Sequence, residues 1–170
     1  MLDLKGEKIF IDIEGYNQFI DELERLKLES LSIATRGSEE AKNAVGDGWH
    51  DNFAFEESMR ESRTIASKIN KMMEEKQILK VINKTKLKEE FVNIDDVIKL
   101  EIIYSEDDKE EEIVQLTGKY MPNTENDIKE ISLNSPIGKV IYKNKIGTIN
   151  EYKVNDRVIK VKIIEKINKV

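Results

Sequence analysis

The feature that most constrains the fold is an apolar repeat that advances in alternating steps of three and four residues. This spacing is typical of a helix that packs one narrow stripe against a second helix in a coiled coil. The stripe positions are Tyr16, Phe19, Leu23, Leu26, Ser30, Ile33, Gly37, Ala41 and Ala44. Its residues are bulky near Tyr16 and small near Ala44, so the two helices are expected to come closer toward the far end.

A second run with the same period follows a break at Gly46-Asp47-Gly48. Its expected stripe is Phe55, Met59, Ser62, Ala66, Ile69 and Met73. Two helical runs joined by a short glycine-containing turn predict an antiparallel hairpin. Each arm has about 28 residues and therefore reaches roughly 40 Å. Asp51 or Asn52 is suited to cap the second helix.

The composition agrees with a thin helical element. Charged residues make up 36% of the 170 residues and the hydrophobic set only 39%, with a net charge of −6. An average soluble domain is about a quarter charged and nearly half apolar. The surplus of charge therefore favours a coiled coil combined with a small domain over one thick globule.

Several classes of protein are made improbable by what the sequence lacks. It contains no cysteine and one histidine, His50, so disulfide frameworks, thiolate metal sites and catalytic triads with a spare base are not expected. No run approaches the roughly 18 apolar residues of a membrane span, and the start does not resemble a signal peptide. We expect a cytoplasmic protein without membrane contact. Its acidic balance also argues against tight nonspecific binding to duplex DNA.

The second half has a different periodicity. A polar, basic stretch at 82–88 indicates a connector, and after it apolar and polar residues alternate as in β-strands. The expected strands are 97–104, 113–117, 128–133 and a hairpin over 149–167 that turns at Asn155-Asp156. Ser135-Pro136 is expected to open a short helix. The predicted fold class is α+β, with a helical hairpin at 1–82, a linker at 83–90 and a small α+β domain at 91–170.

Two segments resemble one known family, the bacterial transcript cleavage factors GreA and GreB. Residues 131–147, ISLNSPIGKVIYKNKIG, resemble its C-terminal signature: a strand ending in N-S-P, a short helix, then a Lys and Gly turn. Residues 46–52, GDGWHDN, resemble the family's G-D-x-x-E-N tip between the helices. Gly15-Tyr16, followed by Leu23 and Leu26-Lys27, is similar to its opening helix. The resemblance extends over nearly the whole chain.

The resemblance implies a role in transcription. In this family the hairpin enters the secondary channel of RNA polymerase, and acids at its tip help to hold a second Mg²⁺ and position a water. The polymerase's own site then cleaves backtracked RNA near its 3′ end. The resemblance also implies an FKBP-like C-terminal domain that docks at the channel rim through Asn134, Ser135 and Pro136. We therefore expect a monomer that is not itself an enzyme and binds Mg²⁺ only together with polymerase.

The tip departs from the family pattern in its spacing. Asp47 matches the tip aspartate, whereas Asp51 matches the tip glutamate only if one residue has been inserted between them. Ala54 and Phe55 stand where the family often has an acid and a tyrosine. Both acids also have a structural interpretation, because Asp-Gly is a common turn and Asp51 can cap a helix.

Further candidates for contacts with RNA or polymerase surround the tip. These are Trp49, His50, Asn52, Arg60 and Arg63. An exposed tryptophan in a turn favours a partner contact, although the ring could instead fold over Phe53 or Phe55. The histidine could equally be a solvated turn residue, and the arginines ordinary solvent-facing charges on a coiled coil.

Two other functions remain open from the sequence. The altered tip also fits a factor that occupies the channel and inhibits or modulates polymerase without cleavage. A helical clasp with an FKBP-like domain also fits a chaperone or prolyl isomerase, although the second half is poor in the aromatic residues that would line a proline pocket.

Overall fold

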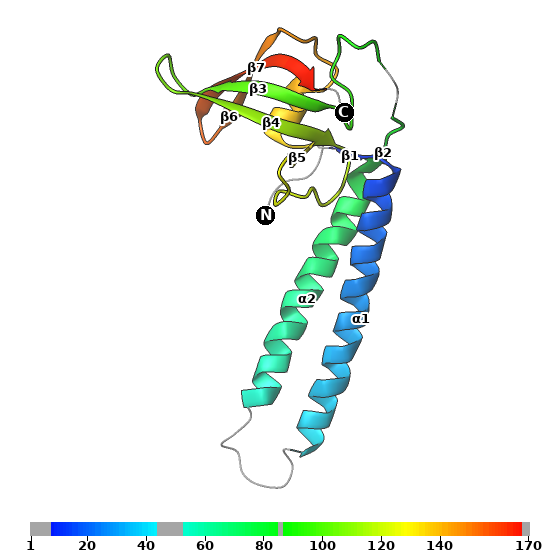
Figure 1. The fold of residues 1–170 in the computed structure, drawn as a ribbon. Coiled ribbons are helices and arrows are strands. Elements are labelled where there is room, and N and C mark those ends of the chain that lie inside the picture. The colour runs from blue at the N-terminus through cyan, green and yellow to red at the C-terminus, as the bar shows by residue number, and fades with distance from the viewer. Residues whose placement is uncertain (1–7, 44–52, 85–86, 168–170) are drawn as a thin grey trace. The chain divides into compact units, whose positions relative to one another are not determined.

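A computed structural model describes residues 8–43, 53–84 and 87–167 of the chain. It confirms the α+β class, with two long helices and a small curled sheet (Figure 1). The chain divides into two compact units, one containing Phe19–Leu79 and the other containing Lys8–Gln18 together with the chain from Lys80 onward. This division differs from the expected boundaries in the placement of Lys8–Gln18. That segment belongs with the second unit because the Asp12 amide donates a hydrogen bond to the Gly118 carbonyl at 3.0 Å.

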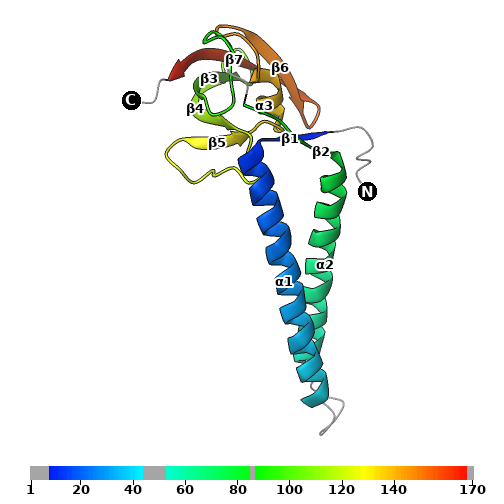
Figure 2. The same ribbon diagram turned by 90° about the vertical axis from the view of Figure 1, so that its right-hand side faces the viewer.

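The first unit is an antiparallel hairpin of α1 (Ile13–Asn43) and α2 (Phe53–Ile78) (Figures 1 and 2). The stripe predicted for α1 is the stripe that the structure buries. Its most buried described members are Phe19, Leu23, Leu26 and Ile33. The outer positions of α1 are mostly exposed, as the high charge content of the chain predicts.

The stripe predicted for α2 was wrong at every second position, because Phe55, Ser62 and Ile69 are half-buried as members of a seam whose other positions were shifted by one residue. The buried positions of α2 are Ser58, Ile65 and Met72, spaced seven residues apart, whereas Met59 and Met73 are 41% and 45% exposed. The physical reason lies in the partner helix. A Cβ atom added at Gly37 would lie only 3.0 Å from the Ser58 hydroxyl oxygen, so the helices approach closely where two small residues face each other. The expected close approach toward the far end is therefore present, with Ser58 rather than Met59 in the seam.

The remaining strands form a two-stranded sheet and a five-stranded sheet. In the small sheet, β1 (Ile9–Ile11) pairs with β2 (Leu79–Val81). The larger sheet has the order β5-β4-β3-β7-β6. Its strands are β3 (Val97–Ile103), β4 (Lys109–Thr117), β5 (Lys129–Ser132), β6 (Ile149–Val154) and β7 (Arg157–Ile167). β3 is antiparallel to both β4 and β7, whereas β5 runs parallel to β4.

The β6–β7 hairpin turns where the sequence predicted. Asn155 and Asp156 have φ angles of +47° and +65°, the left-handed region that a type I′ hairpin turn requires at both central positions. Across this turn Val154 pairs with Arg157. On β7, Val161 and Ile163 are fully buried and Lys160 is exposed, so one face of this strand is buried and the other faces solvent.

The core of the second unit lies on one face of this sheet against α3 (Pro136–Ile141). Its buried members come from the strands, from α3 and from the segments beside them. They are Val92, Ile94, Ile98, Leu100, Val114, Leu116, Leu133, Ile141, Val161 and Ile163. Among the helices that the structure describes, none has the length and apolar character needed to cross a bilayer.

Candidate functional site

The predicted acidic tip, residues 46–52, falls in a segment outside the described residues. The side chains concerned are Asp47, Trp49, His50, Asp51 and Asn52. The structure does define their frame, because α1 ends at Asn43 and α2 begins at Phe53. Both acids therefore belong to the connection between the two helices, at the end of the hairpin where Gly37 meets Ser58.

The two predicted basic residues lie on α2 near this connection. Arg60 and Arg63 are both exposed, within about three turns of the first residue of α2. Across the hairpin, Arg36 of α1 forms an ion pair with Glu61. Arg60 lines a shallow groove beside this pair, on the face where both helices present charged side chains. The hairpin therefore has one strongly charged face close to the tip.

The side chain of Asn134 is hydrogen-bonded to the backbone of strand β1. Its amide oxygen accepts a hydrogen bond from the Phe10 amide at 2.8 Å, and its amide nitrogen donates to the Phe10 carbonyl at 2.7 Å. This pair of bonds imitates the pairing of a neighbouring strand. Asn134 thus fastens β1 to the start of α3, a structural role that the sequence did not predict.

Ser135 and Pro136 begin α3 as the sequence predicted. The Ser135 hydroxyl accepts a hydrogen bond from the Gly138 amide at 2.9 Å, and Pro136 occupies the first helical turn. This is a normal helix start, in which the cap satisfies an amide that would otherwise lack a partner. Pro136 is exposed, so this residue remains available to a partner, whereas Asn134 and Ser135 have internal partners.

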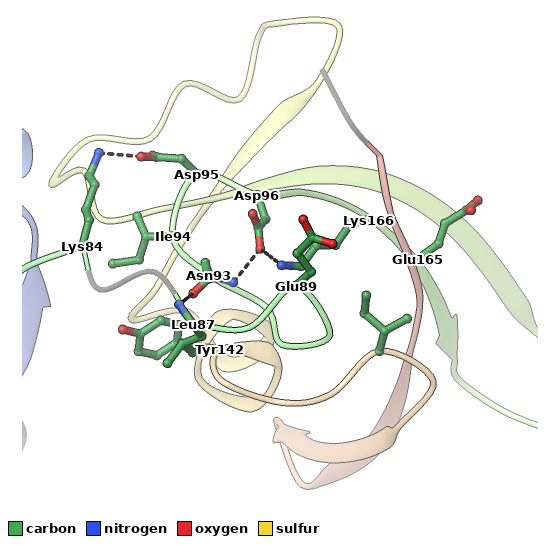
Figure 3. A pocket seen from close by; sticks show the side chains of 11 residues that line it. Lys84, Leu87, Glu89, Asn93, Ile94, Asp95, Asp96, Tyr142, Glu165 and Lys166 are labelled. Carbon is green, nitrogen blue, oxygen red and sulfur yellow. Dashed lines mark hydrogen bonds and ion pairs between the residues drawn. The ribbon is translucent and has the colours of Figure 1, made fainter. Parts of the chain in front are cut away.

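A hollow of the second unit lies beside this helix (Figure 3). Its volume is about 780 Å³, and Leu87, Ile94 and Tyr142 form its apolar side. Tyr142 is the one aromatic side chain among the described residues that line it. That lining gives little support to a proline-binding pocket, which relies on several aromatic walls.

Four of the charged side chains around this groove form two ion pairs. Asp96 accepts a hydrogen bond from the Asn93 amide at 2.6 Å and forms an ion pair with Lys166 at 2.6 Å. Lys84 contacts Asp95 at 2.6 Å (Figure 3). The arrangement is that of a braced surface loop, and no general acid–base pair is evident among these described residues.

Lys84 also reaches a buried acid that the sequence analysis missed. Asp12 is 1% exposed, accepts a hydrogen bond from the Gly15 amide at 2.7 Å and lies 3.2 Å from the Lys84 ammonium. Burial acts to lower the pKa of Lys84, but hydrogen bonds to Asp95 and Asp12 outweigh it and raise that pKa above its ordinary value. Lys84 therefore stays charged and ties the connector to the start of α1.

A second missed pair braces the loop after β4. The Lys119 ammonium donates to Glu130 at 2.8 Å, and the second oxygen of Glu130 accepts from the Asn123 amide at 2.9 Å. The hydrogen bond from Glu130 raises the pKa of Lys119. The sequence pattern predicts neither the Lys84–Asp12 pair nor the Lys119–Glu130 pair, because the partners in each pair are more than ten residues apart along the chain. The described residues hold no group of three or more acids or histidines arranged to bind a metal ion.

Fold and site together define a class of two-part protein: a thin helical hairpin with acids at its connection, followed by a small α+β domain. Comparison with known proteins makes this class specific. Residues 87–167 match the family model described as the C-terminal domain of transcription elongation factors GreA/GreB. The transcription elongation factor GreA of Acetivibrio thermocellus is 30% identical over 164 residues, covering 94% of this chain and 96% of its own length. GreA of Thermosipho africanus is 28% identical over 161 residues, covering 95% and 97%.

Two solved structures were also matched over most of the chain. The GreA factor homolog 1 (Gfh1) of Thermus thermophilus is 17% identical with a TM-score of 0.43, covering 95% of this chain and 100% of its own. The GreA/GreB factor of Nitrosomonas europaea is 14% identical with a TM-score of 0.38 and the same coverage. From the sequence relatives, the chain belongs to the GreA/GreB family of transcription elongation factors.

Proposed function

We propose that this chain binds RNA polymerase, inserts its hairpin into the secondary channel and stimulates cleavage of backtracked RNA by the polymerase active site. The observation that carries the proposal is the match to GreA along nearly the full length of both chains. It is supported by a hairpin whose second arm has 26 residues, about 39 Å of helix. Such an arm is long and thin enough to carry side chains far into a narrow channel.

In this proposal Asp47 and Asp51 supply carboxylate oxygens at the end of the arm. The available donors suit Mg²⁺, because the tip offers two carboxylates and the Asn52 amide, and the chain has no thiol. When bound between the tip and the polymerase, Mg²⁺ would stabilise the attacking and leaving oxygens of phosphodiester hydrolysis. The hydrolysis itself belongs to the polymerase.

Exposed arginines of α2 near the tip would offer positive charge to the RNA. Arg60 and Arg63 are exposed there, and ion pairing to phosphate would orient the RNA 3′ segment. The second unit would dock at the channel rim through the exposed Pro136, while Asn134 and Ser135 hold that residue in place. In this proposal Pro136 contacts the polymerase directly, whereas Asn134 and Ser135 contribute by fixing the position of Pro136.

The test is a cleavage assay on stalled, backtracked polymerase complexes. We expect the wild-type chain to shorten the RNA, and Asp47→Asn and Asp51→Asn to reduce the rate at least about 100-fold, as loss of a group needed for transition-state stabilisation does. Asp21→Asn serves as the matched control, because Asp21 is an exposed acid on α1 remote from the tip. Equal binding by all variants is required, and a tip variant that cleaves like wild type would overturn the assignment.

The spacing of the tip acids favours one alternative. Three residues separate Asp47 from Asp51, and Asp51 is one methylene shorter than the glutamate that the family pattern expects. A tip with this geometry could occupy the channel without placing both carboxylates on one ion. In that case the chain would bind polymerase and slow RNA synthesis, and the RNA would keep its length. Deleting His50 and introducing Asp51→Glu would restore the family spacing, and this variant would then stimulate cleavage.

A further inference from the structure

Strand β1 presents one aromatic side chain to solvent. Side chains alternate between the two faces of a strand, so Phe10 lies on the face opposite to Ile9 and Ile11. Ile11 is fully buried, whereas Phe10 is 39% exposed. A ring that stays partly in water adds less to the stability of the fold than a buried one, and aromatic residues are enriched at protein–protein interfaces. The Phe10 side chain is therefore a candidate for a contact with another protein.

Hydrogen bonds hold the backbone of β1 at both edges. In an extended strand the amide and carbonyl of one residue point to one edge, and those of the next residue point to the other edge. On one edge, the Ile11 carbonyl accepts a hydrogen bond from the Ile82 amide at 2.8 Å. On the other edge, both backbone groups of Phe10 bond to the Asn134 side chain, at 2.8 and 2.7 Å. The backbone that carries the ring is thus fixed before a partner binds, which lowers the entropic cost of binding.

The Asn134 side chain also places Phe10 close to the proposed docking residue Pro136. Asn134 precedes Pro136 by two residues, so their Cα atoms are at most about 7 Å apart. Between them, the Ser135 hydroxyl accepts a hydrogen bond from the Gly138 amide and fixes the start of α3. Pro136 itself is exposed. Two exposed rings, of Phe10 and Pro136, are therefore carried by neighbouring rigid segments of the same compact unit.

The exposed charges that flank these two rings are basic. Among the described residues, Lys8 precedes Phe10 by two positions, and Lys139 follows Pro136 by three, about one turn along α3. Both lysines are exposed. Apolar rings with lysines beside them complement a surface in which acidic groups surround an apolar side chain.

We propose that Phe10 is a second point of contact with RNA polymerase, next to Pro136, and that Asn134 presents it. The inference rests on the proposed function, because it takes polymerase as the partner that docks at Pro136. The polymerase side of the contact is an apolar side chain among acidic groups. Asn134 then orients two contact residues: Pro136 through the chain and Phe10 through its amide group.

The test is equilibrium binding of the full chain to a stalled, backtracked polymerase complex. Phe10→Ala should weaken binding about tenfold, as loss of an aromatic anchor does. The matched control is Tyr104→Ala, an aromatic residue 46% exposed directly after β3, which should change binding by less than about twofold. Binding by Phe10→Ala as tight as wild type would overturn this inference and leave the proposed function intact. No binding by the wild-type chain would overturn both.

A cross-linking experiment identifies the partner of Phe10 without depending on affinity. A chain with the photoreactive residue p-benzoylphenylalanine in place of Phe10 should cross-link to a polymerase subunit, whereas the same residue in place of Tyr104 should not. Cross-linking of position 10 to a second copy of the chain would overturn the contact, and so would no cross-link despite full binding.

A double-mutant cycle tests the role of Asn134. If Asn134 presents Phe10, the losses of affinity from Asn134→Ala and Phe10→Ala should combine to at least about threefold less than their product, because the two changes remove the same contact. Asn134→Ala combined with Tyr104→Ala should show no such shortfall. Independent losses from Asn134→Ala and Phe10→Ala would overturn the presenting role.

Discussion

The hairpin and the α+β domain bury their apolar residues in contrasting ways. In the hairpin, buried side chains form a single line along each helix, as with Leu23 and Leu26 on α1. In the domain, a cluster of ten buried residues from the sheet, α3 and adjacent segments surrounds positions such as Leu100. A line of contacts leaves each residue next to solvent, whereas a cluster surrounds it. Damage should therefore remain local in the hairpin and spread through the domain.

The largest expected effect is at the centre of the domain. Leu100→Ala should lower the free energy of unfolding of the domain by about 4 kcal/mol, since a fully buried leucine leaves a cavity that a sheet cannot close. Urea unfolding followed by circular dichroism measures this loss. The control is Leu28→Ala, at a position 68% exposed, which should change stability by less than about 0.5 kcal/mol. Similar losses for the two variants would refute the clustered core.

A smaller effect is expected for the equivalent change in the hairpin. Leu26→Ala should cost about 2 kcal/mol, the low end for buried leucines, because the two helices can close part of the gap. Hydrogen exchange should show faster opening of α1 and α2, with little change in β3 and β7. If the sheet amides lost protection equally, the hairpin and the domain would not be separate cooperative units.

Removing the Lys119–Glu130 ion pair after β4 should lower the free energy of unfolding by an intermediate amount that depends on pH. Lys119→Met should destabilise the domain by about 1 to 2 kcal/mol at neutral pH, because it leaves the Glu130 carboxylate, 8% exposed, without its ammonium partner. Glu130 raises the pKa of Lys119 above 10.5, so its stabilisation is complete below that pH and declines as the pH rises through the folded-state value. The stability gap between wild type and variant should therefore narrow above about pH 10.5. A gap that widened in alkali would contradict the pairing.

The smallest effect is expected for one added methyl group at the point where the hairpin helices meet. Gly37→Ala gains about 1 kcal/mol of helix propensity but places its Cβ 3.0 Å from the Ser58 hydroxyl oxygen. These terms nearly cancel, so thermal unfolding should change little. Gly37→Leu cannot fit and should separate the distal ends of the helices, at a cost of about 1 to 3 kcal/mol. If the leucine variant were as stable as wild type, Gly37 and Ser58 would not be in close contact.

The parts of the fold that depend on local pattern could be predicted from the sequence. The α1 stripe, the cap at Ser135 and the turn at Asn155-Asp156 each follow from spacing or turn chemistry within a few residues. Half of the α2 seam could not be chosen correctly, because Met59, Ala66 and Met73 fit the repeat as well as their buried neighbours one residue before them, and only the partner helix decides which set is buried. The small pair Gly37 and Ser58 makes that choice.

Long-range polar contacts were beyond sequence reasoning. Asp12 meets Lys84, and Asn134 meets Phe10, through the path that the β1 segment takes within the second unit. The parallel pairing of β5 with β4 likewise requires the three-dimensional path of the chain. The tip residues Asp47 and Asp51 remain predictions, since they lie outside the described residues.

The most direct test of the central claim is where the hairpin connection lies when the chain is bound to polymerase. A single cysteine introduced by Gly48→Cys, carrying a photoactivated cross-linker, can be compared with Asp21→Cys at an exposed position on α1. In a backtracked complex, the account predicts cross-linking of Gly48→Cys to the RNA 3′ segment and none from Asp21→Cys. Cross-linking to RNA from Asp21→Cys alone, or from neither variant despite full binding, would show that the hairpin does not deliver its tip to the catalytic centre.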